Sequence, residues 1–261
     1  MRIKTLYKHR AILLESRSPK KNRYLIVCDL HIGFEERFRG QGVRLHSDAT
    51  NMASELESLI DENNVTHLIV NGDVKSGIDR ILETEWEEVP RFFSRLSKKC
   101  TISVVPGNHD GGLSNLLSDS AVLEDINGVL LEDTLILHGH TRPLTKFNEC
   151  KRLIIGHVHP IFQRKGSPLS GQPVWAFLKM PKKLVFREML DQGKDEDPEL
   201  EVIVMPSFNM ALSPAGYHPD YDGEERKPSS LAKDLRQAEE AIVVTLSGAI
   251  IGDKTLLTNL F

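Results

Sequence analysis

Short apolar runs alternate with amphipathic segments over the first 160 residues. Five of these runs predict strands: residues 24–28, "THLIVNGD", "CTISVVPGNHD", "DTLILHGH" and "RLIIGHVH". Apolar residues at helical spacing predict a helix over 45–64 and another over 80–99, which Pro90 either kinks or divides. Two more strands are expected in 1–15, as a hairpin that turns near 8–10. Strands that alternate with helices predict an α/β sheet in this half.

The pattern changes after residue 160, where strand-like runs follow one another with little helix between them. These runs are "PVWAFLKM", "KLVFREML", "LEVIVMP", "AIVVTLS" and "AIIGDKTLL", and only 229–240 has helical spacing. A second sheet is therefore expected from the C-terminal half. We interpret 1–261 as a single domain with a motif-bearing α/β half, 1–160, and a strand-rich half, 161–261, which contains polar loops at 190–200 and 219–230.

Composition narrows the class of protein. The chain has 261 residues, 40% of them hydrophobic, which is enough for a large core. No apolar stretch approaches the ~18 residues that span a bilayer, so we expect a cytoplasmic protein with no membrane partner. Cys28, Cys100 and Cys150 form no CxxC pair and indicate reduced thiols. The net charge of −4 argues against a dedicated non-specific nucleic-acid binder but leaves room for a local basic surface.

Potential metal ligands follow each of the five apolar runs of the first half. They are Asp29 with His31, Asp73, Asn108 with His109, His138 with His140, and His157 with His159. In open α/β sheets, sites form beyond the carboxyl ends of the strands, so these side chains are expected to converge. Alternate residues of an extended backbone share a face, which predicts that Asp29 and His31 point the same way, as do His157 and His159.

The types of ligand indicate a hard or borderline metal. Carboxylate, amide and imidazole donors without a thiolate suit Mn, Fe, Mg, Zn or Ni. Seven candidates are too many for one ion: Asp29, His31, Asp73, Asn108, His138, His157 and His159. They suit two divalent ions that share a bridging carboxylate, about 3.5–4 Å apart, and manganese is our first expectation.

The ordered set "DLH", "NGD", "PGNHD", "LHGH" and "GHVH" resembles the signature of the calcineurin-like metallophosphoesterases over 23 to about 160. The phrases "DLHIGFEERFRGQGV", "ILHGHTRP" and "MPSFN" resemble a narrower branch of archaeal SbcD-related and bacterial DNA-ligase-associated phosphoesterases. The resemblance implies a mixed α/β, four-layer sandwich of two mixed β-sheets flanked by helices. It also implies one metal on Asp29, His31, Asp73 and His159, and a second on Asp73, Asn108, His138 and His157.

The resemblance also implies roles for residues around the metals. His109 is expected to face the substrate, where it stabilises charge or protonates the leaving oxygen. Asp110 either accepts a hydrogen bond from His109 or stabilises the turn before Gly111. His140 is expected just behind the ligands. Arg37 and Arg142 either contact the substrate or are solvated.

Two further features have both a functional and a structural interpretation. Lys75 departs from the acid or histidine that many relatives carry after "GD"; it either contacts phosphate or, as we favour, is solvated. The stretch "WAFLKMPKKLVF" interleaves aromatic and basic residues, which can stack single-stranded nucleic acid. A half-buried strand with alternating aromatic side chains is the commoner explanation.

The function expected from these features is a metal-dependent phosphoesterase. The two ions supply a hydroxide for in-line attack on phosphorus. A phosphodiesterase or nuclease linked to DNA repair is the first hypothesis, with DNA or RNA as substrate and DNA-repair proteins as partners. The alternatives are a phosphatase or phosphodiesterase of a small nucleotide or metabolite, and a non-catalytic binding module, which the intact motif set disfavours. A homodimer through the C-terminal strands is left open.

Overall fold

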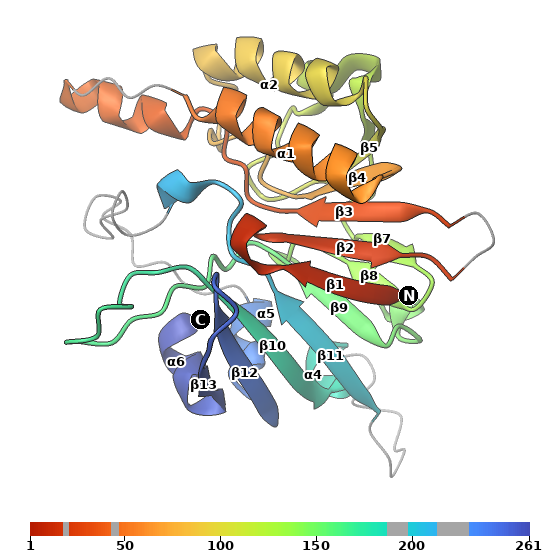
Figure 1. The fold of residues 1–261 in the computed structure, drawn as a ribbon, viewed down its shortest axis with the longest axis vertical. Helices are drawn as coiled ribbons and strands as arrows, with labels where there is room; N and C mark the ends of the chain where they lie inside the picture. Colours follow the sequence, from red (N-terminus) through yellow and green to blue (C-terminus); the bar gives the residue numbers. More distant parts are fainter. Residues whose placement is uncertain (18–20, 43–46, 187–197, 213–229) are drawn as a thin grey trace.

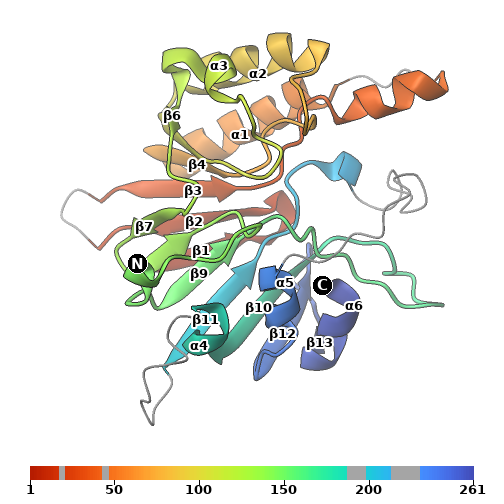
Figure 2. The same ribbon diagram turned by 180° about the vertical axis from the view of Figure 1, so that it is seen from behind.

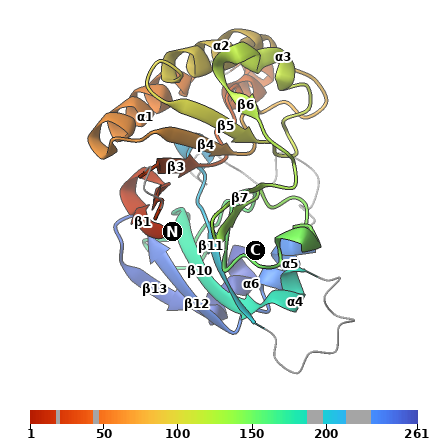
Figure 3. The same cartoon turned by 90° about the vertical axis from the view of Figure 1, so that its right-hand side faces the viewer.

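The computed structural model describes residues 1–17, 21–42, 47–186, 198–212 and 230–261. They form four layers, with helices outside and two mixed β-sheets between them (Figures 1 and 2). Figure 3 shows the layers from the side, with helices over the outer face of each sheet. The predicted fold class is therefore confirmed. The interpretation as a single domain stays a prediction.

The first sheet has six strands. Its first three strands pair antiparallel with one another, and the third to the sixth pair in parallel. In order across the sheet they are β1 (Arg2–Leu6), β2 (Ala11–Glu15), β3 (Arg23–Val27), β4 (His67–Asn71), β5 (Thr101–Val105) and β6 (Val122–Leu123). Successive residues of a strand point to opposite faces. Leu13 accordingly packs toward the helices, while Ile12 and Leu14 pack into the core between the sheets.

The second sheet has seven strands, and it corrects one prediction. In order they are β13 (Ile250–Asp253), β12 (Glu240–Thr245), β10 (Val174–Pro181), β11 (Glu199–Val204), β9 (Arg152–Ile155), β8 (Thr134–Ile136) and β7 (Val129–Leu131). The second sheet therefore does not come from the C-terminal half alone. β9 lies parallel to β8 and to β11, and its alternate residues bury apolar side chains on both faces of this sheet.

Helices cover the outer face of each sheet. Those over the first sheet are α1 (Ala49–Asn63), α2 (Glu83–Leu96) and α3 (Ser114–Leu117), and those over the second are α4 (Lys182–Val185), α5 (Ser230–Leu235) and α6 (Leu257–Leu260). The 3₁₀ helices are η1 (Tyr7–His9), η2 (Phe34–Gln41), η3 (Ser118–Ser120), η4 (Thr145–Phe147), η6 (Met210–Leu212) and η8 (Lys254–Leu256). α2 continues through Pro90 and is not divided. None of the helices described is long and apolar enough to cross a bilayer.

One strand predicted in the C-terminal half is wrong. The run "KLVFREML" was expected to be extended, but 182–185 form α4, whose Val185 packs into the outer core of the second sheet. Residues 187–197 lie outside the described residues, as do most of the predicted polar loops at 190–200 and 219–230. The hairpin in 1–15 and the helix within 229–240 are confirmed.

Candidate metal centre

Five loops meet at one edge of the sandwich, beyond the carboxyl ends of β3, β4, β5, β8 and β9 (Figure 1). The predicted convergence of the five polar clusters is confirmed, but the strands that carry them belong to two sheets. β3, β4 and β5 are neighbours in the first sheet, and β8 and β9 are neighbours in the second. The site therefore lies where the two sheets face each other.

Three overlapping groups of side chains in the described part of the chain could each hold a cation. They are Asp29, His31 and His159; His31, Asp73 and His109; and Asp73, His138 and His157. Within each group the ligand atoms lie within 4.8 Å of one another. Asp73 Oδ2 lies 3.5 Å from His31 Nε2 and 3.3 Å from His138 Nε2. Asp73 thus stands between the first group and the third.

The backbone at these ligands is left-handed, which corrects the expected extended geometry. The φ angles are 57° at Asp29, 41° at His31, 63° at His157 and 45° at His159. β3 ends at Val27 and β9 ends at Ile155, so both pairs of ligands lie in loops beyond the strands. Such conformations cost roughly 1–3 kcal/mol per residue and persist only where surrounding contacts impose them.

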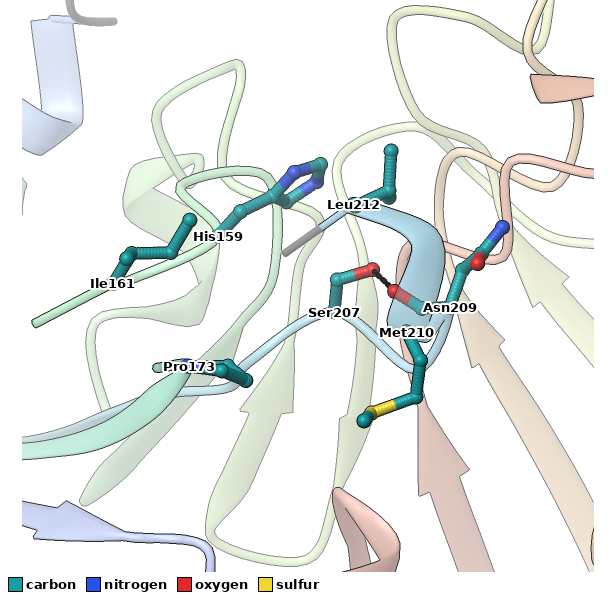
Figure 4. Close-up of a pocket in the computed structure, with 7 residues that line it drawn as sticks. All are labelled: His159, Ile161, Pro173, Ser207, Asn209, Met210 and Leu212. Atoms are coloured by element: carbon teal, nitrogen blue, oxygen red, sulfur yellow. Dashed lines mark hydrogen bonds between the residues drawn. The ribbon is translucent and has the colours of Figure 1, made fainter. Parts of the chain in front are cut away.

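Contacts that impose this backbone come from the far half of the chain, in the "MPSFN" segment after β11. Ser207 Oγ donates to the Asp29 carbonyl at 2.8 Å, and Asn209 Nδ2 donates to the Leu30 carbonyl at 2.8 Å. Both residues line a small pocket together with His159, and the segment approaches it from β11 (Figure 4). Sequence reasoning gave these residues no role, although their phrase carried part of the family resemblance.

Two glycines allow the ligands to approach the backbone closely. Gly72 has φ +81°, and a Cβ added there would overlap with the His138 ring. A Cβ added at Gly107 would overlap with Asp73. Glycine is needed at these positions because any side chain would displace a ligand.

Gly72→Ala is expected to weaken metal binding at the group of Asp73, His138 and His157 by about tenfold or more, since the new methyl group displaces the His138 imidazole. Metal titration of the purified variant measures this. Gly166→Ala is the matched control, because Gly166 has φ +80° and nothing within 4 Å of the added Cβ. Equal losses of affinity in the two variants would assign the effect to backbone strain instead.

Electrostatics keep most of these groups in the form that binds metals. Burial alone raises the pKa of the Asp29 and Asp73 carboxyls, but neighbouring imidazoles outweigh it and hold both pKa values below their usual range. Burial, and then the charge of His138, lowers the pKa of His157 to about 3. Burial also holds the pKa of His31 well below its usual value. Metal binding requires this combination of ionised carboxylates and neutral imidazoles.

His138 is the exception among the imidazoles. Although burial lowers its pKa, Asp73 and then Asp29 raise it to about 9, so a cation must displace a proton from this ring. Its Nδ1 lies 2.9 Å from the Asn71 carbonyl oxygen, which turns Nε2 toward Asp73. A carbonyl behind a ligating histidine fixes the ring in this way at metal sites.

The donor set fits divalent cations. Both ring nitrogens of buried His31 lack a hydrogen-bond partner within the described residues. An unsatisfied buried polar group costs free energy, and a bound cation would remove that cost at Nε2. Carboxylate and imidazole donors without thiolate suit the hard and borderline divalent ions expected from the sequence.

His109 and Asp110 both lie at the site, and of the two roles left open for Asp110 the structure favours stabilisation of the backbone. His109 Nδ1 lies 2.7 Å from the Ser76 carbonyl oxygen, and its Nε2 lies 3.9 Å from Asp73 Oδ2. The Asp110 carboxylate instead accepts hydrogen bonds from the backbone N–H groups of Val74, at 2.9 Å, and Gly107, at 2.8 Å. Asp110 therefore stabilises the loops, and a backbone carbonyl orients His109. The pKa of Asp110 is raised to about 6 by burial and then by Asp73.

The remaining predicted site residues differ in position. His140 is half-buried, with its ring centroid 5.3 Å from that of His138. Asn108 is exposed on the loop that carries His109. Arg37 is exposed on η2, with its guanidinium 5.4 Å from the Phe34 ring centroid.

Arg142 lies among structural partners rather than at the substrate side. Its guanidinium donates to the Leu184 carbonyl at 3.1 Å and forms an ion pair with Asp234 of α5. These contacts connect the "HGH" loop to the outer helices of the second sheet. The expected contact between Arg142 and substrate has no support in this arrangement.

The burial of Lys75, Trp175 and Phe186 decides between the functional and structural interpretations of these residues. Lys75 is fully buried and donates through Nζ to the Gly77 carbonyl, so the expectation that it is solvated is wrong. Trp175 and Phe186 are buried in cores, and Trp175 stacks on Phe177. The stacking platform for nucleic acid is therefore excluded at these two rings, and most residues of β10 are buried rather than half-buried.

Two solved structures are similar to this chain. A solved structure of nuclease MPE from Pseudomonas putida is 17% identical, covers 95% of this chain and 94% of its own, and has a TM-score of 0.57, which supports the fold. Yfce, a phosphoesterase from E. coli, is 16% identical over 88% of this chain and 97% of its own, with a TM-score of 0.36. No curated protein matches significantly.

The comparison with family models gives the assignment. The model described as calcineurin-like phosphoesterase matches residues 23–187, which is more than half of the chain and contains all five ligand-bearing loops. The chain belongs to the calcineurin-like phosphoesterase family and is a metal-dependent phosphoester hydrolase.

Proposed function

We propose that this chain hydrolyses a phosphodiester at a pair of divalent ions. One ion would be held by Asp29, His31, Asp73 and His159, and the other by Asp73, Asn108, His138 and His157. The observation that carries the proposal is the position of Asp73 Oδ2, 3.5 Å from His31 Nε2 and 3.3 Å from His138 Nε2. Divalent ions bound in such a pair acidify water and neutralise charge on phosphoryl oxygens.

His109 is the proposed proton donor. A carbonyl oxygen only accepts, so the 2.7 Å contact with Ser76 requires a hydrogen on Nδ1. The Nε2 atom then faces the ligands, 3.9 Å from Asp73 Oδ2. When the ring carries a second proton on Nε2, it can stabilise a phosphoryl oxygen or transfer that proton to the leaving oxygen.

Charge at the rim of the site supports a diester. Burial lowers the pKa of His109, and the charge of the exposed Arg37 guanidinium adds a smaller lowering. Divalent ions and a guanidinium suit a phosphate anion, and a phosphodiester carries a single negative charge. The resemblance to the DNA-ligase-associated branch and the fold shared with nuclease MPE favour a nucleic-acid diester and a role in DNA repair. A small nucleotide diester is the second candidate, since the buried rings of Trp175 and Phe186 provide no platform for a single strand of nucleic acid.

Hydrolysis by metal-stripped protein resupplied with Mn²⁺ tests the proposal. An aryl phosphodiester, an aryl phosphomonoester and labelled single-stranded DNA are compared, with His109→Ala as the control. Manganese-dependent cleavage of the diester, lost in the control, is the expected result. Cleavage of DNA would assign the enzyme to the nucleases, and cleavage of the small diester alone would assign it a small substrate. Cleavage confined to the monoester would contradict the proposal.

A further inference from the structure

We propose that Glu85 is a positioning residue: from the first turn of α2, it fixes the turn whose carbonyl orients His109. This inference rests on the proposed role of His109. It concerns a residue that lies outside all five metal-binding motifs. Glu85 is completely buried, and a buried carboxylate is retained only where hydrogen bonds or charges compensate it.

The Glu85 carboxylate holds three backbone N–H groups. Its Oε1 accepts hydrogen bonds from Ser76, at 2.8 Å, and from Gly77, at 2.7 Å. Its Oε2 accepts from the N–H of Leu82, at 2.7 Å, which is the ordinary capping contact at the start of a helix. The two contacts through Oε1 extend beyond what capping α2 requires.

The turn over 74–77 is held from its other side as well. Asp110 Oδ1 accepts from Val74 at 2.9 Å and from Lys75 at 3.3 Å, and Lys75 Nζ donates to the Gly77 carbonyl. The N–H of Ser76 also lies 3.1 Å from the Ile32 carbonyl oxygen. In the middle of these contacts, the Ser76 carbonyl is directed at His109 Nδ1.

Gly33 makes room for the Glu85 side chain, and Gly77 lies against its carboxylate. A Cβ at Gly33, where φ is +88°, would lie 3.0 Å from Glu85 Cγ. A Cβ at Gly77 would lie 3.4 Å from Glu85 Oε1. The carboxylate thus occupies a fitted space between the α2 N-terminus and the loop behind His109. A shift of this carboxylate would move the Ser76 peptide and with it the imidazole.

A carboxylate can do what an amide cannot at this position. Both carboxylate oxygens accept, and together they satisfy three N–H groups. In Glu85→Gln, an NH₂ group replaces one oxygen, so either the cap contact to Leu82 or both contacts through Oε1 are lost; Glu85→Asp shortens the side chain and withdraws both oxygens from all three N–H groups. We expect kcat to fall at least tenfold, with KM within about twofold and both metal ions retained, because an orienting contact to the proton donor acts mainly in the transition state.

A double-mutant cycle with His109→Ala separates positioning from general destabilisation. If Glu85 acts through His109, Glu85→Gln causes little further loss of kcat in the His109→Ala protein, because the group that it positions is already absent. Multiplicative losses, or an unchanged kcat in both Glu85→Gln and Glu85→Asp, would overturn the inference. If His109→Ala itself leaves kcat unchanged, the proton-donor role fails, and the inference fails with it.

Two additional variants keep the test decisive. Leu82→Pro removes the capping N–H but leaves the contacts through Oε1, and φ at Leu82 is −75°, which proline adopts. The kcat of Leu82→Pro is expected to stay near the wild-type value. A loss of kcat equal to that of Glu85→Gln would indicate that Glu85 acts only by capping the helix. Glu85→Asp keeps the buried charge with a shorter side chain. If Glu85→Gln fails to fold, Glu85→Asp replaces it in the double-mutant cycle with His109→Ala.

Discussion

Asp73→Asn is expected to abolish binding of both metal ions and to reduce turnover by roughly three orders of magnitude. Asp73 is buried, and its Oδ2 lies 3.3 Å from His138 Nε2 and 3.5 Å from His31 Nε2, so it contributes to the groups on both sides. Asparagine keeps the shape but removes the negative charge and one of the two accepting oxygens. Both ions then lose the ligand that they share.

Elemental analysis of the purified protein measures this outcome directly. Asp234→Asn is the matched control, because Asp234 is also a buried carboxylate but pairs with Arg142 beside the outer helices of the second sheet. The control is expected to keep both ions even if its thermal stability falls. An Asp73→Asn protein that retained two ions per chain would contradict a shared ligand.

His109→Ala is expected to keep both ions and to reduce kcat by roughly 10²–10⁴-fold. The side chain is 13% exposed, and Nε2 is the ring nitrogen directed toward the ligands. Loss of a proton donor should be more severe for an alkyl leaving group, which needs protonation, than for an acidic aryl leaving group. Steady-state kinetics with the two esters, alongside metal analysis, measure the difference.

The control for this variant is His9→Ala, since the His9 side chain is 41% exposed and its Nδ1 contacts only Glu55 among the contacts described. Its kcat is expected to be unchanged. Equal losses for the alkyl and aryl esters in His109→Ala would indicate that the imidazole stabilises phosphoryl charge instead of protonating the leaving oxygen. Loss of metal from His109→Ala would move the residue into the ligand set.

The clusters of ligands were predictable because each is local: an apolar run followed at once by Asp, Asn or His. Which sheet each run joins was not predictable. The run at 153–155 has the sequence of any strand that is buried on both faces. Such a sequence does not indicate which strands pair with it. Only pairing with β11, some fifty residues further along, places β9 in the second sheet.

The backbone around the ligands was beyond prediction for a different reason. Asp29 and His31 adopt positive φ in a loop whose Asp29 and Leu30 carbonyls are held by the "MPSFN" segment, and that contact spans much of the chain. The partner of His109 is a carbonyl group, which every residue carries, so Ser76 has no sequence signature. Lys75 was assigned to solvent on its charge alone, but its aliphatic stem and its bond to Gly77 allow it to be buried.

The division of the ligands between two sheets has a consequence for the lifetime of the protein. Asp29, His31 and Asp73 follow strands of the first sheet, while His138, His157 and His159 follow strands of the second. An ion bound across this boundary acts as a reversible crosslink between the halves of the sandwich. Binding at a hundred times the dissociation constant adds about 2.7 kcal/mol to the free energy of unfolding. Scarcity of metal would therefore shorten the survival of the folded chain against proteolysis as well as stop its turnover.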